Sequence, residues 1–329
     1  MKILAIETSC DETAAAVTEG TEILSSVKIS QEIHSKWGGV VPSLAKRDHE
    51  KNIEHVINKA LEGREVDAIA VTVGPGLAMA LEVGIKWAKK LAVEWHKPLI
   101  GVNHIEGHIL SALTPEVIFP CMALVISGGH TQIIRVDEIG KYKILAQSLD
   151  DDIGEALDKG ARMLGLPYPG GPALEKLAVQ GDPKKYKLPL PMARREGKAF
   201  SYSGLKTAFY RLVNSSSDLN KADLAACFQA MVFKHLIRTV RIVLSTKGEV
   251  LRTRDLLVGG GVVANQKLRS ELEVMGSEIG VRVRYPANLM LCTDNAAMIG
   301  VAAGFKATRG EFDDPEKIDR LPRWRVDER

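Results

Sequence analysis

The sequence predicts an α/β fold, because short apolar runs that end at glycine or other small residues alternate with longer stretches of helical periodicity. Runs this short and this apolar are typical of buried strands. The expected strands cover residues 3–6, 68–73, 123–126 and 256–258. A chain of 329 residues can form two domains of ordinary size or one large α/β unit, and we expect two similar halves.

Helices are expected after several of these strands. Apolar residues recur at helical spacing over 77–95, and His96-Lys97-Pro98 ends the pattern with a basic residue and a helix breaker. The acidic residues 150–152 can cap a helix that runs through Met163 and ends at Gly165. The polar segment 214–218 predicts a surface connection, and the charged tail 313–329 predicts a partly extended segment anchored by Leu321, Pro322 and Trp324.

Composition excludes several classes of protein. No run of about 18 apolar residues is present, and the chain starts directly with a strand-like segment, so we expect a cytoplasmic protein with no membrane association. Four scattered cysteines form no C-x-x-C pair, which predicts reduced, mostly buried thiols and neither a disulfide framework nor a thiolate zinc site; they are Cys10, Cys121, Cys227 and Cys292.

Basic residues gather in one segment, although the net charge of only +3 does not by itself indicate a nucleic-acid binder. The cationic residues are Lys184, Lys185, Lys187, Arg194, Arg195, Lys198, Lys206 and Arg211. Aromatic residues lie among them, namely Tyr186, Phe200, Tyr202 and Tyr210. This pattern favours a surface on which cations follow phosphates and rings stack on bases, and the alternative is an ordinary solvated basic face.

Two histidines four residues apart, His104 and His108, and the distant acid Asp294 look like one metal site. If the histidine segment is helical, both imidazoles project from one face at neighbouring heights. The alternative is a pair of partly buried polar residues with no ligand.

Glycine-rich turns follow three of the expected strands, and such turns bring backbone amides close to anions. They are Gly74-Pro75-Gly76, Ser127-Gly128-Gly129-His130-Thr131 and Gly259-Gly260-Gly261, the last followed by Asn265. None forms a P-loop or a complete dinucleotide fingerprint, so together they indicate a nucleotide held between two lobes. Asp158 or Glu175 could accept hydrogen bonds from the paired hydroxyls of a ribose.

Ten short motifs, which span about nine-tenths of the chain, resemble those of a known family. They are Glu7-Thr-Ser-Cys-Asp-Glu-Thr13, Gly38-Gly-Val-Val-Pro42, Lys46-Arg-Asp-His49, Gly74-Pro-Gly-Leu77, His104-x-x-Gly-His108, Ser127-Gly-Gly-His-Thr-Gln132, Tyr168-Pro-Gly-Gly-Pro172, Phe200-Ser-Tyr-Ser-Gly-Leu-Lys206, Gly260-Gly-Val-x-Ala-Asn265 and Cys292-Thr-Asp-Asn295. The set resembles the TsaD/OSGEP family in its bacterial form, whose members install N6-threonylcarbamoyladenosine in tRNA and were formerly described as O-sialoglycoprotein endopeptidases. One departure is Ser43, where the family usually has glutamate; serine keeps hydrogen bonding but loses the charge.

The resemblance implies an actin-like, two-lobed α/β fold of the sugar kinase and heat-shock chaperone ATPase class, with a nucleotide cleft between the lobes. The implied lobes are residues 1–112 with 295–329, and residues 113–294. The implied reaction moves threonylcarbamoyl from threonylcarbamoyl-AMP to N6 of the adenosine next to the anticodon, on the 3′ side, of tRNAs that read ANN codons.

The resemblance also implies site residues, cofactors and partners. His104, His108 and Asp294 would hold one divalent iron or zinc ion per subunit, a Lewis acid for the carbamoyl carbonyl. The substrate or nucleotide contacts would be Val125, Ile126, Ser127, Gly128, Gly129, Asp158, Gly171, Glu175 and Asn265. ATP or ADP could occupy the same cleft. The implied partners are tRNA, the paralogous subunit TsaB and the small ATPase TsaE, with a homodimer when the chain is alone.

Three other functions stay open from the sequence. A metallopeptidase is disfavoured because Glu106 would point about 160° away from both histidines on a helix of roughly 3.6 residues per turn. A small-molecule kinase of the same fold leaves the histidines without a role, and a non-catalytic binding protein leaves the metal residues unexplained. No general base is assigned; His130 is a candidate, with a hydrogen-bonding role as the alternative.

Overall fold

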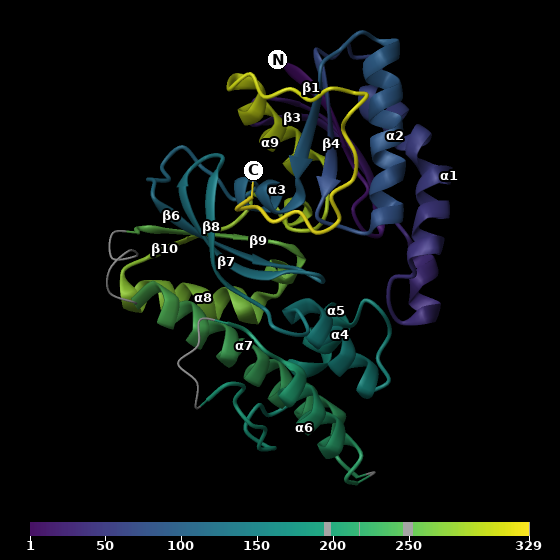
Figure 1. Cartoon of the computed structure of the whole chain (residues 1–329). Coiled ribbons are helices and arrows are strands. Elements are labelled where there is room, and N and C mark those ends of the chain that lie inside the picture. The colour runs from purple at the N-terminus through teal and green to yellow at the C-terminus, as the bar shows by residue number, and fades with distance from the viewer. Residues whose placement is uncertain (194–198, 217, 246–252, 329) are drawn as a thin grey trace. The chain divides into compact units, whose positions relative to one another are not determined.

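The computed structural model describes residues 1–193, 199–216, 218–245 and 253–328. Two compact units make up the chain (Figure 1). The first contains residues 1–112, 139–141 and 286–329, and the second contains residues 113–138 and 142–285. This division places residues 286–294, Asp294 included, in the first unit, whereas the expected boundary put them in the second. The reason is that Asp294 directly precedes a helix that packs on the first unit's sheet.

The first unit is built around a mixed sheet. Its elements, in chain order, are β1 (Lys2–Glu7), β2 (Glu12–Glu19), β3 (Glu22–Ser30), η1 (Glu32–Trp37), α1 (Pro42–Leu61), β4 (Ala68–Gly74), α2 (Ala78–Glu94), β5 (Leu99–Asn103), α3 (His104–Leu110), η3 (Leu289–Leu291) and α9 (Ala296–Thr308). The strands described lie in the order β3-β2-β1-β4-β5. β2 is antiparallel to β1 and β3, whereas β1, β4 and β5 are parallel.

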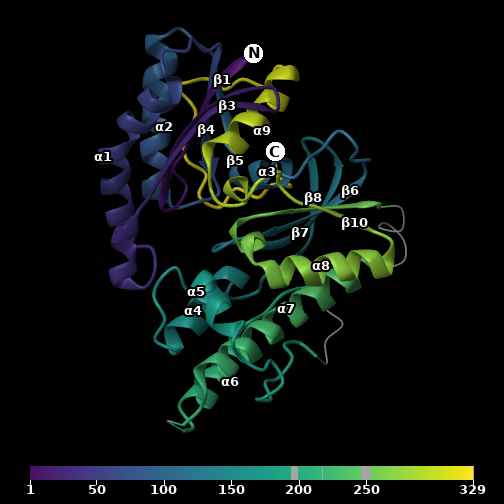
Figure 2. The same cartoon turned by 180° about the vertical axis from the view of Figure 1, so that it is seen from behind.

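Helices cover both faces of this sheet. α1 and α2 pack on one face and α9 packs on the other (Figures 1 and 2). The central strands β1 and β4 are almost entirely buried because they have neighbours on both faces, and this explains their continuous apolar sequence. Small residues set the close approach of α9, since a Cβ on Gly300 would lie 2.5 Å from the Thr18 hydroxyl on β2.

The second unit repeats this strand order. Its elements are β6 (Cys121–Ile126), β7 (Thr131–Glu138), β8 (Lys141–Gln147), α4 (Ile153–Met163), α5 (Gly170–Ala178), α6 (Ser203–Val213), α7 (Lys221–Ser245), β9 (Asp255–Gly259), η2 (Gly261–Ala264), α8 (Gln266–Ile279) and β10 (Arg282–Arg284). Read from its other end, as β8-β7-β6-β9-β10, this sheet corresponds strand for strand to β3-β2-β1-β4-β5, because β6 is antiparallel to β7 and parallel to β9, just as β1 is antiparallel to β2 and parallel to β4. The prediction of two similar halves is therefore confirmed.

The predicted strands and helices are present, with ends shifted by no more than two residues. The helix predicted over 77–95 is α2, and the one predicted to run through Met163 and stop at Gly165 is α4. Residues 214–216 lie between α6 and α7, as expected for a surface connection. All four cysteines are free, and only Cys10 is partly exposed. Among the described residues, no helix has the length and hydropathy needed to cross a bilayer.

The C-terminal tail is anchored on the first unit, partly as predicted. Trp324 packs against the apolar core beside the sheet, and Ile318 belongs to that core. Leu321, however, leaves its side chain about half exposed, and its backbone N–H donates to the Val73 carbonyl at 2.7 Å. Leu321 therefore holds the tail through its main chain, not through its side chain.

Candidate metal centre

The histidine helix α3 starts directly at the end of β5. Asn103, the last residue of β5, caps it: its side-chain oxygen accepts hydrogen bonds from the backbone N–H groups of Ile105 at 2.9 Å and of Glu106 at 3.4 Å. Such caps satisfy amides that a helix leaves unpaired at its start. Because every residue of α3 is buried, the two imidazoles lie inside the unit rather than on its surface.

Helix α9 brings the distant acid to the histidines. Asn295 caps α9 by accepting from the Met298 N–H at 2.9 Å, and Asp294 immediately precedes this cap. α3 packs closely on the same helix, because a Cβ on Gly107 would lie 3.0 Å from Ile299 and 3.1 Å from Met298. One helix therefore both positions Asp294 and supports the segment that carries His104 and His108.

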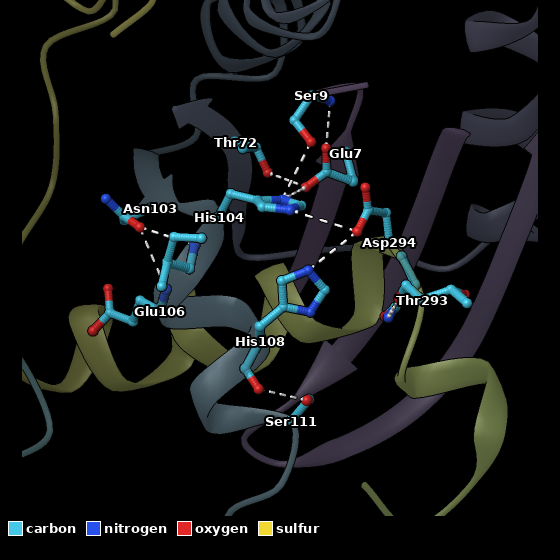
Figure 3. A network of polar contacts seen from close by, with 12 residues as sticks. Glu7, Ser9, Thr72, Asn103, His104, Glu106, His108, Ser111, Thr293 and Asp294 are labelled. Carbon is cyan, nitrogen blue, oxygen red and sulfur yellow. Dashed lines mark hydrogen bonds and ion pairs between the residues drawn. The ribbon is translucent and has the colours of Figure 1, made fainter. Parts of the chain in front are cut away.

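The three predicted ligands converge, as Figure 3 shows. Oδ1 of Asp294 lies 3.1 Å from Nε2 of His108 and 3.5 Å from Nε2 of His104. The two rings stand nearly perpendicular, with centroids 4.6 Å apart. One potential ligand atom from each residue lies within 4.8 Å of the others, close enough for all three to contact one ion.

Behind the triad lies a buried carboxylate, Glu7, at the end of β1. Its Oε2 accepts from Nδ1 of His104 at 3.0 Å and from the Thr72 hydroxyl at 2.7 Å, and its Oε1 accepts from the backbone N–H of Ser9. The Ser9 hydroxyl also lies 3.2 Å from Nδ1 of His104. These contacts favour a proton on Nδ1 of His104, so a metal ion on this ring would bind Nε2, the nitrogen directed at Asp294.

Charge dominates the electrostatics of this cluster. Burial by itself would lower the pKa of His104, but the charges of Asp294 and Glu7 outweigh it and raise that pKa to about 10. Burial would likewise raise the pKa of Asp294, but the two histidines hold it well below its usual range. Burial lowers the pKa of His108 despite its hydrogen bond to Asp294. The cluster therefore attracts a positive charge at the point where the three residues meet.

The donor set fits a divalent metal. The raised pKa of His104 means that a proton on Nε2 can bridge to the carboxylate of Asp294, and a divalent cation bound there would take the place of that proton. Among the described side chains, Nδ1 of His108 is one of the buried atoms without a hydrogen-bond partner, so neither nitrogen of that ring is committed as a donor elsewhere. Two imidazoles and one carboxylate suit zinc or ferrous iron and leave coordination positions open.

The glutamate that a metallopeptidase would need does not face this cluster. Glu106 is buried, and its carboxylate points away from both imidazole rings in Figure 3. This agrees with the direction expected from helix geometry. It therefore cannot activate a water bound beside the histidines.

In the second unit, hydrogen bonds link the segments predicted to bind the nucleotide. The backbone N–H of Gly154, in α4, donates to the Ser127 carbonyl at 3.2 Å. Asp158, on the same helix, accepts from the Gly171 N–H at 2.9 Å. Glu175, on α5, accepts from the N–H of Gln266, next to Asn265, at 2.8 Å. The structure thus brings these segments together within one unit.

The strand end at Ser127 exposes backbone rather than side chains. Val125 and Ile126 are fully buried in β6, so their side chains cannot touch a ligand and the sequence prediction for them is limited to main-chain contacts. Gly128 and Gly129 are exposed, and a Cβ on either would meet no atom within 4 Å. His130 is partly exposed, and its carbonyl accepts from the Ser127 N–H at 2.8 Å.

The other polar residues of this group already have structural partners. Asn265 caps α8 through the Leu268 N–H at 3.0 Å and donates to the Gln229 side chain at 3.1 Å. Asp158 and Glu175 hold the backbone amides described above. A bound nucleoside could therefore reach only the remaining lone pairs of these two carboxylates.

The glycine turn at residues 74–76 is not an open anion site, contrary to the sequence prediction. The Gly76 N–H donates to the Pro322 carbonyl at 3.2 Å, and a Cβ on Gly74 would lie 1.9 Å from the Leu321 carbonyl oxygen. The turn at 74–76 therefore accommodates the C-terminal tail. Its glycines are explained by this close backbone approach rather than by a phosphate.

The prediction of a nucleic-acid surface on the basic segment is wrong for three of its residues. Phe200 and Tyr202 are fully buried and cannot stack on bases, and Lys206 forms an ion pair with Asp151. Arg194, Arg195 and Lys198 lie outside the described residues. Apart from Lys206, six described members of the segment have exposed or partly exposed side chains: Lys184, Lys185, Tyr186, Lys187, Tyr210 and Arg211.

Sequence reasoning did not place Glu7, Ser9 or Thr72 at the candidate metal centre. Ser9 lies just beyond the end of β1, and Glu7 and Thr72 lie near the carboxyl ends of β1 and β4, where neighbouring segments meet at one edge of the sheet. That rule predicts clustering of polar residues at carboxyl ends of strands and would have found them.

The family model for "TsaD: tRNA N6-adenosine threonylcarbamoyltransferase" matches residues 22–301. The chain belongs to this family. A relative of that name from Vesicomyosocius okutanii is 46% identical over 338 residues, which cover 99% of this chain and 96% of the relative. One from Geobacter sp. strain M21 is 45% identical over 342 residues, covering 99% and 97%. The TsaD family is therefore matched over nearly the whole chain.

Solved structures show the same fold at low sequence identity. Full-length HypF in its phosphate- and nucleotide-bound form has a TM-score of 0.62 and 14% identity; the match covers 95% of this chain but only 47% of HypF. The ROK hexokinase from Thermus thermophilus has a TM-score of 0.52 and 15% identity, with 94% and 100% covered. These likenesses confirm the actin-like α/β fold predicted from the sequence.

Proposed function

We propose that the chain transfers the threonylcarbamoyl group of threonylcarbamoyl-AMP to N6 of the adenosine adjacent to the anticodon, on its 3′ side, in tRNAs that read ANN codons. The observation that carries this proposal is near full-length identity of about 45% to proteins named for that reaction, in a chain whose histidines and aspartate converge. Membership of the TsaD family supports the transferase over a peptidase or kinase, and the direction of Glu106 supports it further.

His104, His108 and Asp294 would hold one divalent iron or zinc ion, whose chemistry as a bound Lewis acid is to polarise a carbonyl oxygen. The rest of the work falls to the chain. Glu7 keeps a proton on Nδ1 of His104, and Asp294 supplies a negative charge that the two imidazoles share. These groups fix the charge of the site before substrate arrives, so little reorganisation is needed during the reaction.

The adenylate would be bound by the second unit. The exposed amides of Gly128 and Gly129 suit its phosphate and carbamoyl end, with Ser127, Val125 and Ile126 contributing main chain. The nucleoside would be held by Asp158, Gly171, Glu175 and Asn265, and ATP or ADP would compete for the same groups. An acyl adenylate already carries a good leaving group, so alignment of the weakly nucleophilic adenine amine is the main requirement. We assign His130 no proton-transfer step.

The exposed basic residues Lys184, Lys185, Lys187 and Arg211 support a tRNA surface on the second unit. The same proposal includes TsaB and TsaE as partners and self-association of the chain when it is alone. It also includes a cytoplasmic location, where tRNA is available. Light scattering of the chain alone and mixed with each partner measures the assemblies.

The test is mass spectrometry of tRNA nucleosides after incubation with threonylcarbamoyl-AMP, this chain and the two partners. We expect N6-threonylcarbamoyladenosine in a tRNA with adenosine at the target position. A matched tRNA with guanosine there should stay unmodified, because guanosine has no N6 amine. Peptide fragments released from a glycoprotein, with no change in the tRNA, would support the peptidase instead.

A further inference from the structure

The carboxylate of Glu7 has a role that the sequence did not indicate. We propose that Glu7 is a positioning residue that fixes the His104 proton on Nδ1 and thereby makes Nε2 the metal donor. This inference rests on the proposed function only in taking His104, His108 and Asp294 as metal ligands.

The strand topology explains why Glu7 reaches His104. β1 and β4 are parallel neighbours with Ile6 opposite Val71, so Glu7, the last residue of β1, lies beside Thr72, which is still within β4 and near its carboxyl end. β5 lies on the other side of β4 and ends where α3 begins. The end of β1 therefore faces the first turn of the histidine helix, 97 residues away in sequence.

The hydrogen bonds of Glu7 leave its carboxylate one orientation. Its side chain is 0% exposed, and an unpaired carboxylate in such a place is too costly to remain ionised. Three donors stabilise the charge: the Ser9 N–H on Oε1, and the Thr72 hydroxyl and His104 Nδ1 on Oε2. The two donors other than His104 fix the carboxylate plane, and the carboxylate then fixes the imidazole ring.

A comparison of the two histidines supports a specific role. Nδ1 of His104 has a carboxylate and a hydroxyl within 3.2 Å, whereas Nδ1 of His108 has no hydrogen-bond partner among the described residues. His104 is thus the oriented ligand, and His108 is held only through Asp294 and its packing. A carboxylate on the far nitrogen also makes the imidazole a better donor, and loss of such a group typically costs 10–100-fold in metal affinity.

The experiment measures zinc affinity of the metal-stripped full-length chain by competition with a chromophoric chelator, in the absence of tRNA and adenylate. Glu7→Gln keeps the shape and removes the charge, and we expect its affinity to fall about 10–100-fold. Thr72→Val should cost less, and the double variant should match Glu7→Gln alone because Thr72 acts through Glu7. The control is Thr13→Val, which removes an equally buried hydroxyl bonded to His49 at 2.8 Å; its affinity should stay within about twofold of the parent.

Cobalt(II) absorption separates positioning from general destabilisation. We expect the visible bands of the cobalt-loaded protein to shift in Glu7→Gln and not in Thr13→Val, while both variants unfold cooperatively without metal. Parent-like affinity and spectrum in Glu7→Gln would overturn the inference even if the chain modifies tRNA. If Glu7→Gln loses zinc affinity and the parent chain does not modify tRNA, the inference about Glu7 stands and the proposed reaction is rejected.

Discussion

The two units arrange their candidate functional groups in opposite ways. In the first unit, side chains from segments far apart in sequence converge on one point and are held by buried hydrogen bonds behind them. In the second unit, the open groups are backbone amides at Gly128 and Gly129, and the polar side chains nearby are engaged in joining helices. A metal centre thus depends on side-chain identity, whereas the strand-end site depends on backbone shape and on the absence of Cβ atoms.

The largest effect is expected at the metal centre. His104→Ala combined with His108→Ala should abolish tRNA modification and zinc binding, because two of the three candidate ligands are removed. The fold should remain, since other buried residues of α3 and α9 keep their packing. Metal content, nucleoside mass spectrometry and thermal unfolding check this. Full modification by the double variant would show that the side-chain centre has no catalytic role.

Alanine substitutions at two glycines of the second unit should distinguish a glycine needed for ligand access from one needed for close packing. Gly171→Ala adds a methyl where no atom lies within 4 Å, so stability should stay within about 0.5 kcal/mol while adenylate affinity falls about tenfold or more if the nucleoside lies there. Gly154→Ala would place its Cβ 2.6 Å from the Ser127 carbonyl and should cost about 1–3 kcal/mol of stability. Denaturant unfolding and calorimetric titration with a non-hydrolysable adenylate analogue measure both. Unchanged affinity in Gly171→Ala would remove that residue from the site.

The smallest effect is expected at the basic segment, where charge acts without defined geometry. Replacing Lys184, Lys185 and Lys187 with alanine should weaken tRNA binding and make it less dependent on salt, with the slope falling by about one for each phosphate that is no longer neutralised. Lys206→Ala is the matched control, because its ammonium is paired with Asp151 and should contribute to stability instead. Equal binding by the triple variant across a salt series would place the tRNA elsewhere.

Sequence patterns were sufficient for the central strands and for the longer helices. Residues 3–6, 68–73, 123–126 and 256–258 are strands because continuous apolar runs of this length suit a sheet covered on both faces. β2 was not predicted: its Thr13-Ala-Ala-Ala-Val-Thr18 core is rich in alanine, and only the tight packing of α9 against Thr18 explains small residues in a strand. β3, β7, β8 and β10 carry weaker patterns, because their faces are partly exposed or their lengths short.

At the candidate site, sequence spacing identified residues that lie close together in the chain. It did not identify contacts between residues on distant segments. His104 and His108 are recognisable as a pair four apart, but the hydrogen bond of Glu7 with His104 spans 97 residues and needs the sheet order. The turn at Gly74 was misread as an anion site for the same reason, because its partner, Leu321, lies in the tail. Phe200 and Tyr202 looked like stacking residues until burial was known.

The packing of Gly107 on α9 links the three candidate metal ligands mechanically. Asp294 leads directly into α9, and α3 rests against its first turns, so a small displacement of that helix would carry the aspartate and the imidazoles in the same direction. The distances among the donor atoms would then change little, and the hydrogen bond from His104 to Glu7 ties the same cluster to the end of β1. Helix α9 is thus the common support of all three candidate ligands.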